Sequence, residues 1–146
     1  MKRFSFFNEL NALLKKELKK EYDIVIQAAA VSDYALESAS NKKISSGRKS
    51  LKLTLKPTLK IINCLRKFKP DSFLVGFKFQ PHLAAGKLLI EARNLIKEAR
   101  LDLAVANSAR NKQYSAYLVS EKKSFGPFLS KEAMAINLVK LIGSKF

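Results

Sequence analysis

The chain has 146 residues, and its 28 lysines and arginines outnumber its 12 aspartates and glutamates, so the formal net charge is +16. This length predicts one compact unit, and no apolar run approaches the roughly 18 residues that span a bilayer. One cysteine and one histidine exclude an internal disulfide and a zinc site built from several such ligands. Because the N-terminal residues lack a signal-peptide core, we expect a soluble, cytoplasmic protein.

Hydrophobic periodicity predicts helices alternating with strands. Apolar residues at helical spacing indicate a helix over 5–20, and an apolar run ending in three alanines indicates a buried strand over 23–30. Residues 34–50 are polar and predict a loop, whereas the alternation over 51–56 predicts a half-exposed strand closed by Pro57. Further helices are expected over 58–68, 83–99 and 131–142, and further strands over 72–79, 101–107 and 114–120. This order predicts an α/β fold, a three-layer Rossmann-like and largely parallel sheet with helices on both faces.

Positive charge gathers between residues 38 and 70, where eight lysines and two arginines occur without an acidic residue. Such a segment attracts polyanions, which include nucleotides, phosphorylated metabolites and nucleic acid. A basic nucleic-acid-binding module is therefore one alternative. That module would pair its basic face with exposed aromatic residues or a known fold signature, whereas the ten phenylalanines here lie mainly in apolar strands and helix stripes. We therefore expect no specific nucleic-acid binding.

The first predicted strand ends in unusually small residues, Ala28 to Ala30, and Asp33 follows shortly after. Small residues at the carboxyl end of a strand let a ligand approach the backbone, and open α/β sheets bind their ligands at this end. Taken singly, the alanines favour tight packing and Asp33 favours a turn. Phe77 likewise favours a core position and Lys43 a solvated one, so only their joint order favours a functional interpretation.

Five stretches carry a family resemblance when they are taken together. They are Val25 to Tyr34 (VIQAAAVSDY), Lys43 to Gly47 (KISSG), Leu51 to Pro57, Val75-Gly76-Phe77, and Leu101 to Asn107 (LDLAVAN). In this order and at nearly this spacing, they are similar to phosphopantothenate–cysteine ligases of coenzyme A biosynthesis, with the eukaryotic branch the closer match. The resemblance implies that residues 1–146 form one partial domain, the C-terminal part of the nucleotide-binding domain, and that the sheet is incomplete at its N-terminus.

The resemblance implies a ligase that joins 4′-phosphopantothenate and cysteine. The carboxylate attacks the α-phosphate of CTP or ATP, pyrophosphate leaves, and the cysteine amine displaces the nucleotide from the acyl-nucleotidylate. Carried over by position, Lys43 is the catalytic flap residue, Asp33 contacts the nucleotide or its Mg²⁺, Ala28 and Ala29 lie against the nucleotide, Phe77 walls the site, and Pro57 stands at its edge. Positive charge from Mg²⁺ and a mobile lysine offsets the repulsion between an anion and a polyphosphate. No resident metal ligand is assigned.

Departures from the family pattern leave a second interpretation open. The family's Gly- and Ser-rich N-terminal stretch, with its Asn that stabilises the acyl-nucleotidylate, has no counterpart here. Leu95 and Ala99 stand where bacterial members carry two triphosphate-binding lysines, with Lys87 or Lys97 as substitutes. In this second interpretation, the chain is a degenerate or split subunit that lacks activity alone and pairs with a separate chain. We also expect a homodimer through residues 51–55, because family members are dimeric through this region.

Overall fold

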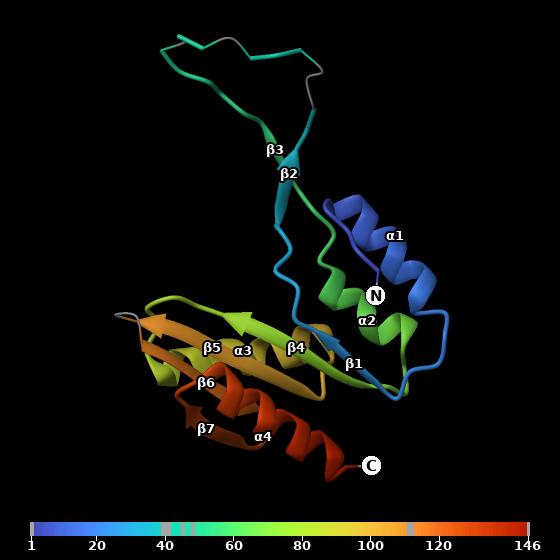
Figure 1. The fold of residues 1–146 in the computed structure, drawn as a ribbon, viewed down its shortest axis with the longest axis vertical. Coiled ribbons are helices and arrows are strands. Elements are labelled where there is room, and N and C mark those ends of the chain that lie inside the picture. The colour runs from blue at the N-terminus through green and yellow to red at the C-terminus, as the bar shows by residue number, and fades with distance from the viewer. Residues whose placement is uncertain (1, 39–41, 45, 48, 111–112, 146) are drawn as a thin grey trace.

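A computed structural model describes residues 2–38, 42–44, 46–47, 49–110 and 113–145 (Figure 1). The helices are α1 (Phe7–Glu17), α2 (Ile61–Phe68), α3 (Ala85–Ala99) and α4 (Lys131–Gly143); the strands are β1 (Ile24–Gln27), β2 (Tyr34–Leu36), β3 (Leu55–Pro57), β4 (Phe73–Phe79), β5 (Leu103–Arg110), β6 (Gln113–Val119) and β7 (Ser124–Phe128). None of the helices in these residues is long and apolar enough to cross a membrane.

The main sheet has five strands in the order β1-β4-β5-β6-β7. β1, β4 and β5 are parallel, whereas β6 and β7 extend the sheet as antiparallel strands. The register places Gln27, the last residue of β1, opposite Gly76 of β4, and places Phe79 of β4 opposite Asn107 of β5. The predicted α/β fold with helices on both faces is therefore confirmed.

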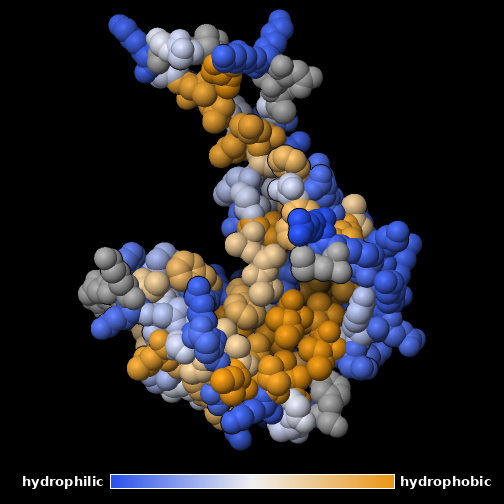
Figure 2. All heavy atoms as spheres, viewed as in Figure 1, coloured by the Kyte–Doolittle hydropathy of each residue, from blue (hydrophilic) through white to orange (hydrophobic). Residues whose placement is uncertain are grey.

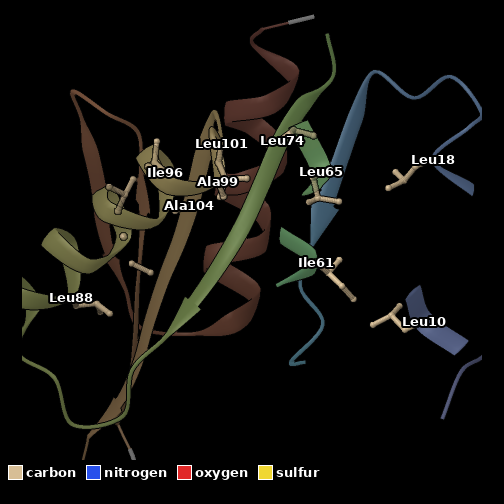
Figure 3. Packing of buried hydrophobic residues seen from close by; sticks show 13 residues of the cluster. Leu10, Leu18, Ile61, Leu65, Leu74, Leu88, Ile96, Ala99, Leu101 and Ala104 are labelled. Carbon is tan, nitrogen blue, oxygen red and sulfur yellow. The ribbon is translucent and has the colours of Figure 1, made fainter. Parts of the chain in front are cut away.

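The helices cover the two faces of the sheet unequally. On one face, α2 and α3 pack on the strands, and α1 packs against α2, as Figure 3 shows for Leu10 and Ile61. The buried side chains of this cluster include Leu65, Leu74 and Leu88. On the other face, α4 packs over part of the sheet. Its buried side chains are Met134, Leu138 and Ile142, and they lie with Val75, Leu103, Val105, Ala116 and Leu118.

Arg66 fastens α2 to the starts of the two central strands. Its guanidinium donates to the backbone oxygens of Arg100 at 2.9 Å and Ser72 at 2.9 Å, and to the Asp102 carboxylate at 2.6 Å. The same carboxylate oxygen accepts from the backbone N–H of Leu74 at 2.8 Å. Because one planar group holds three segments, the beginning of β4 is fixed relative to α2 and β5.

β2 and β3 form a separate two-stranded antiparallel ribbon, in which Tyr34 pairs with Pro57. Together with the described residues between the two strands, this ribbon forms an arm that extends away from the main sheet in Figure 1. Two expectations are corrected here. The predicted loop over 34–50 begins with a strand, and the predicted strand over 51–56 is confined to 55–57. Residues 34–36 and 55–57 form strands because they pair with each other, and the local sequence pattern did not indicate this pairing.

β7 was not expected, because its sequence, SFGPF, contains the two residues least typical of strands. Gly126 has a φ of +124°, and an added Cβ would lie 2.7 Å from the backbone oxygen of Ala116 on the neighbouring strand. Glycine is therefore required for β7 to approach β6. This constraint comes from tertiary packing and has no periodic signal in the sequence.

Candidate functional site

An open cleft of about 420 Å³ lies where the carboxyl ends of β1 and β4 meet the beginning of α2. Its volume falls in the range of about 300–1,000 Å³ that is typical of small-molecule sites. The lining residues are Gln27, Ala28, Ala29, Ala30, Val31, Ser32, Asp33, Thr58, Leu59, Lys60, Ile61, Ile62, Phe77, Lys78, Phe79, Gln80, Leu95 and Asn107. The carboxyl ends of parallel strands are the edge at which open α/β sheets receive ligands.

One wall of the cleft is bare backbone. β1 ends at Gln27, opposite Gly76, so Ala28 follows at the level of Phe77. Ala28, Ala29 and Ala30 are exposed, and none extends beyond a methyl group. A flat ligand can therefore lie against this backbone with the half-buried Phe77 ring close by.

The turn that carries Asp33 is held in place by Thr58, which follows β3. The Thr58 backbone N–H donates to the backbone oxygen of Asp33 at 2.8 Å, and the Thr58 hydroxyl donates to the backbone oxygen of Ser32 at 2.6 Å. The Ser32 hydroxyl also donates to the Tyr34 oxygen at 2.7 Å. These bonds fix the backbone on which the exposed Asp33 carboxylate stands at the cleft.

Two lysines, Lys60 and Lys78, also line the cleft. Lys60 immediately precedes α2, and the first residues of this helix, Ile61 and Ile62, also line the cleft. Lys78 extends from β4, with its ammonium 3.3 Å from the Glu91 carboxylate of α3. A helix N-terminus and nearby ammonium groups both favour an anion. The cleft therefore suits a ligand that combines a planar group with negative charge.

Two half-buried polar residues, Asn107 of β5 and Tyr114 of β6, interact with each other, and Asn107 also lines the cleft. The Asn107 Oδ1 atom is buried without a hydrogen-bond partner among the described residues. Burial raises the pKa of Tyr114 above its ordinary value, and a hydrogen bond from the Asn107 side chain partly opposes this rise. The tyrosine is thus neutral at physiological pH and remains a hydrogen-bonding group.

The structure brings together four of the six residues selected from the sequence. Ala28, Ala29, Asp33 and Phe77 line one cleft, although they come from separate segments. Pro57 lies next to them in β3, opposite Tyr34, and is outside the lining.

Lys43 lies on the arm, between β2 and β3, and its side chain is exposed. It does not line the cleft in this structure. The proposed substitute Lys87 lines a different, shallow pocket on α3, and Lys97 is exposed and outside the cleft lining.

Sequence reasoning missed the cleft residues Thr58, Lys60, Lys78 and Asn107. Lys60 could have been found, because it follows the strand-ending proline by three residues and precedes a predicted helix. Lys78 could have been found as the residue after Val75-Gly76-Phe77. Asn107 could have been found as the last residue of the stretch Leu101 to Asn107, whereas Thr58 had no such signal, since its hydrogen bonds join segments that are distant in the sequence.

A resident metal centre is not indicated by the described residues, which contain no group of three or more His, Cys, Asp or Glu side chains placed to hold one. A magnesium ion carried by a nucleotide makes smaller demands, because phosphates and waters supply most of its ligands and the protein supplies one or two carboxylates. Asp33 is the acidic residue among those lining the cleft. Asp33 therefore fits the role of a carboxylate ligand to a magnesium ion that a nucleotide carries.

The fold and the cleft define an α/β protein with a ligand site at the carboxyl ends of parallel strands. Residues 7–145 match the family described as the DNA/pantothenate metabolism flavoprotein C-terminal domain. The chain belongs to this family.

Individual relatives agree with the family match. The chain is 43% identical over 103 residues to the coenzyme A biosynthesis bifunctional protein CoaBC of Thermococcus kodakarensis, an alignment that covers 70% of this chain and 25% of the relative. The chain therefore spans about a quarter of that protein. In structure it is similar to the DNA/pantothenate metabolism flavoprotein from Streptococcus pneumoniae, with a TM-score of 0.85, 24% identity, and coverage of 99% of this chain and 72% of that one. A Cab2 mutant in complex with phosphopantothenate-cysteine has a TM-score of 0.65 at 19% identity, with coverage of 98% and 54%.

Proposed function

We propose that this chain supplies the nucleotide-binding wall of a ligase of coenzyme A biosynthesis, which joins 4′-phosphopantothenate and cysteine with CTP or ATP. The observation that carries the proposal is the convergence of Ala28, Ala29, Asp33 and Phe77 on one cleft at the strand ends. Family membership, the CoaBC relative and the structural neighbour in complex with phosphopantothenate-cysteine support the same assignment.

Each part of the cleft has a task in this proposal. The base lies against Phe77 and the alanine backbone, and the triphosphate faces Lys60, Lys78 and the beginning of α2. Mg²⁺ accompanies the nucleotide and neutralises phosphate charge, with Asp33 as its carboxylate from this chain. Pro57 sets the edge of the cleft next to the Asp33 turn. Fixed positive charge at the phosphates is the largest contribution that such a wall makes to the reaction.

Lys43 remains the proposed catalytic residue, and the arm is the flap that carries it. The ammonium group would offset the charge that develops as the substrate carboxylate attacks the α-phosphate. Since the arm joins the body only through the segments next to Tyr34 and Pro57, a hinge there would bring Lys43 over the cleft.

The arm is also the proposed site of homodimer formation. A two-stranded ribbon is at best marginally stable alone in water, and this one exposes a row of large apolar side chains. Their exposed fractions are 58% for Tyr34, 47% for Leu36, 49% for Leu51, 58% for Leu53 and 53% for Leu55. A second copy would cover them. We expect sedimentation at micromolar concentration to show a dimer, and a monomer under these conditions contradicts this part of the proposal.

Activity is proposed to require a partner segment. Among the described residues, the cleft is open to solvent. Losing one preorganised donor typically costs about 10² to 10³ in rate, so one wall alone should give weak nucleotide binding and little turnover. The partner supplies the missing wall, either as a separate chain or as further sequence.

Pyrophosphate release from CTP or ATP with phosphopantothenate tests the proposal. We expect release only when the complementing polypeptide is present, and amide formation only when cysteine is added. Under those conditions Lys43→Ala should lower turnover by about 10² or more, whereas Lys49→Ala, another exposed lysine of the arm, should not. Full turnover by Lys43→Ala would remove the flap assignment, and robust turnover by the isolated chain would contradict the need for a partner.

A further inference from the structure

Helices α1 and α2 pack against each other, and a small apolar cavity opens between them. Figure 3 shows Leu10 and Leu18 of α1 on one side, and Ile61 and Leu65 of α2 on the other. The cavity has a volume of about 50 Å³ and is lined by Asn11, Leu14, Lys15, Leu18, Leu59, Ile61, Cys64, Leu65 and Phe68. We call these residues the α1–α2 groove. Among the described residues, none from the main sheet lines it, so the groove lies within the helical layer.

The groove has a buried floor and an exposed rim. Leu18 and Leu65 are 7% and 1% exposed, whereas Phe68 is 44% exposed and Lys15 is also exposed. The Phe68 ring therefore stands partly in water beside an apolar cavity. An apolar side chain placed in this cavity would displace water from both the ring and the floor, which is how anchor residues at interfaces gain affinity.

The volume of the cavity limits the size of that side chain. One water-sized group needs about 10–15 Å³ of such a cavity, so about 50 Å³ admits about four non-hydrogen atoms. A leucine side chain is of this size, whereas a nucleobase is too large.

The rim of the groove is basic. Lys15 lines the cavity, Lys19 follows it beyond the end of α1, and Lys67 precedes Phe68 on α2. These three rim lysines are exposed, and their ammonium groups pair with no carboxylate among the residues that the structure describes. In Figure 2, hydrophilic side chains gather over α1 and the segment after it, on the right of the view.

The chain supplies little acidic charge of its own to neutralise this rim. Residues 11–20 contain four lysines and one glutamate, and residues 60–69 contain three lysines and one arginine without an acidic residue. That glutamate, Glu17, pairs with Lys2 and Lys20. Carboxylates on a partner would therefore complement the rim. A second copy of this chain is a poor occupant, because its formal net charge of +16 has the same sign as the rim.

A nucleic acid would meet the same lysines but would not fill the cavity. Proteins that bind single strands without sequence preference stack successive bases on aromatic faces. Here the apolar lining is aliphatic apart from Cys64 and Phe68. An acidic amphipathic helix fits both features of the groove, because its apolar stripe enters a groove between helices while its charged flanks face the rim.

We propose that the α1–α2 groove docks an acidic, amphipathic helix of a partner protein. One leucine of that helix enters the cavity beside Phe68, and its carboxylates face the three rim lysines. Leu59 and Ile61 line both the groove and the nucleotide cleft, and Phe68 lies at the far end of α2 from them. Docking at Phe68 is a second property of this chain, and it does not depend on the proposed function.

The experiment titrates the full chain with a designed peptide of about 15 residues, or about four helical turns, that carries leucines on one face and glutamates on the others. Isothermal titration should give micromolar binding that weakens as salt is raised. A peptide of the same composition, with its leucines scattered around the helix, is the matched control and should bind weakly.

Cys64 gives a local readout of the groove. It is the single cysteine of the chain and lines the cavity, so its alkylation by iodoacetamide reports on this surface. At a peptide concentration of about ten times the dissociation constant, mass action leaves about a tenth of the chain free, so alkylation should slow about tenfold.

Two groove variants and two matched controls locate the contact. Phe68→Ala and Lys67→Glu should each weaken binding about tenfold, because the first removes the ring beside the anchor and the second reverses a charge at the rim. Phe125→Ala removes a ring of nearly equal exposure, 43%, on β7, and Lys122→Glu reverses an exposed lysine between β6 and β7. Both controls should leave binding within about twofold. Circular dichroism checks that all four variants remain folded.

Four results would overturn the proposal. The first is no saturable binding of the designed peptide. The second is equal binding and equal protection of Cys64 by the scattered peptide or by single-stranded DNA, which would show a general polyanion surface. The third is binding that neither Phe68→Ala nor Lys67→Glu weakens. The fourth is a dimer of this chain that Phe68→Ala dissociates, which would assign the groove to a second copy. Nucleotide binding is measured without the peptide, so failure of docking is distinguishable from failure of the proposed function.

Discussion

The two faces of the main sheet differ in how completely they are buried, and this difference separates stability from function. Where α2 and α3 pack on one face, Leu74 of β4 and Leu88 and Ala92 of α3 are fully buried. The α4 face is closed over β5 and β6 and open over β1 and β4, where Ile26 and Phe79 are half exposed. The first face holds the fold together, and the open part of the second face lies next to the cleft.

The largest expected effect contrasts one aliphatic residue from each face. Leu88→Ala should reduce the free energy of unfolding by about 2–5 kcal/mol, because it removes buried methyl groups and leaves a cavity. Ile26→Ala should cost less than about 1 kcal/mol, because nearly half of that side chain is already in water. Urea denaturation measures both, and equal losses would show that the two faces do not differ.

The next effect concerns the attachment of α2. Arg66→Ala should cost about 1–3 kcal/mol, because the Ser72 and Arg100 oxygens and the Asp102 carboxylate each lose a charged donor. Arg66→Lys should restore little, since an ammonium cannot reach these acceptors together. Full recovery of the denaturation midpoint by lysine would indicate that only the charge at this position matters.

A glycine pair measures how tightly the α2–α3 face is packed. A Cβ on Gly76 would lie 2.5 Å from Leu101 Cδ1 and 2.6 Å from Ile62 Cδ1, so Gly76→Ala should cost about 1 kcal/mol or more through overpacking. On α3, a Cβ on Gly86 meets nothing within 4 Å, and Gly86→Ala should raise stability by up to about 1 kcal/mol. A neutral Gly76→Ala would mean that the two side chains move aside freely.

The smallest expected effect on stability concerns Glu17, the last residue of α1. Lys2 and Lys20 hydrogen-bond to Glu17 and lower its pKa from 4.5 to about 2. Because the folded-state pKa is depressed, the stabilisation is complete above pH 4.5 and is lost as the pH falls towards 2. The difference in urea midpoint between the protein and Glu17→Gln should therefore be small at pH 7, vanish near pH 2 and shrink with salt. A difference that persists at pH 2 would exclude these ion pairs as its source.

Sequence patterns predicted the strands and helices with strong periodicity. The apolar run over 72–79 and the helical stripe over 83–99 correspond to β4 and α3. Two elements were missed because their order comes from pairing: β2 is three residues long, and β7 contains both glycine and proline. The run over 51–56 alternates like a strand, yet only Leu55 and Lys56 of this run lie in β3.

The candidate site, like the fold, could be predicted from the sequence only in part. Ala28, Ala29, Asp33 and Phe77 could be selected because a family resemblance fixed their order, and the strand register then placed Ala28 beside Phe77. The position of Lys43 could not be predicted, because the arm that carries it extends from the sheet and contains few packed residues. Lys60 and Lys78 also line the cleft, and their places shortly after Pro57 and directly after Phe77 could have indicated them.

The central claim is that the cleft at the ends of β1 and β4 binds the nucleotide. Amide chemical shifts of the isolated, ¹⁵N-labelled chain, titrated with Mg²⁺ and CTP or ATP, test it most directly. We expect millimolar binding that shifts the amides of Ala29, Asp33 and Phe77 and leaves those of β7 unchanged, with Phe77→Ala weakening the titration. Shifts confined to the lysines of the arm, or none at these three amides at saturating nucleotide, would contradict the claim.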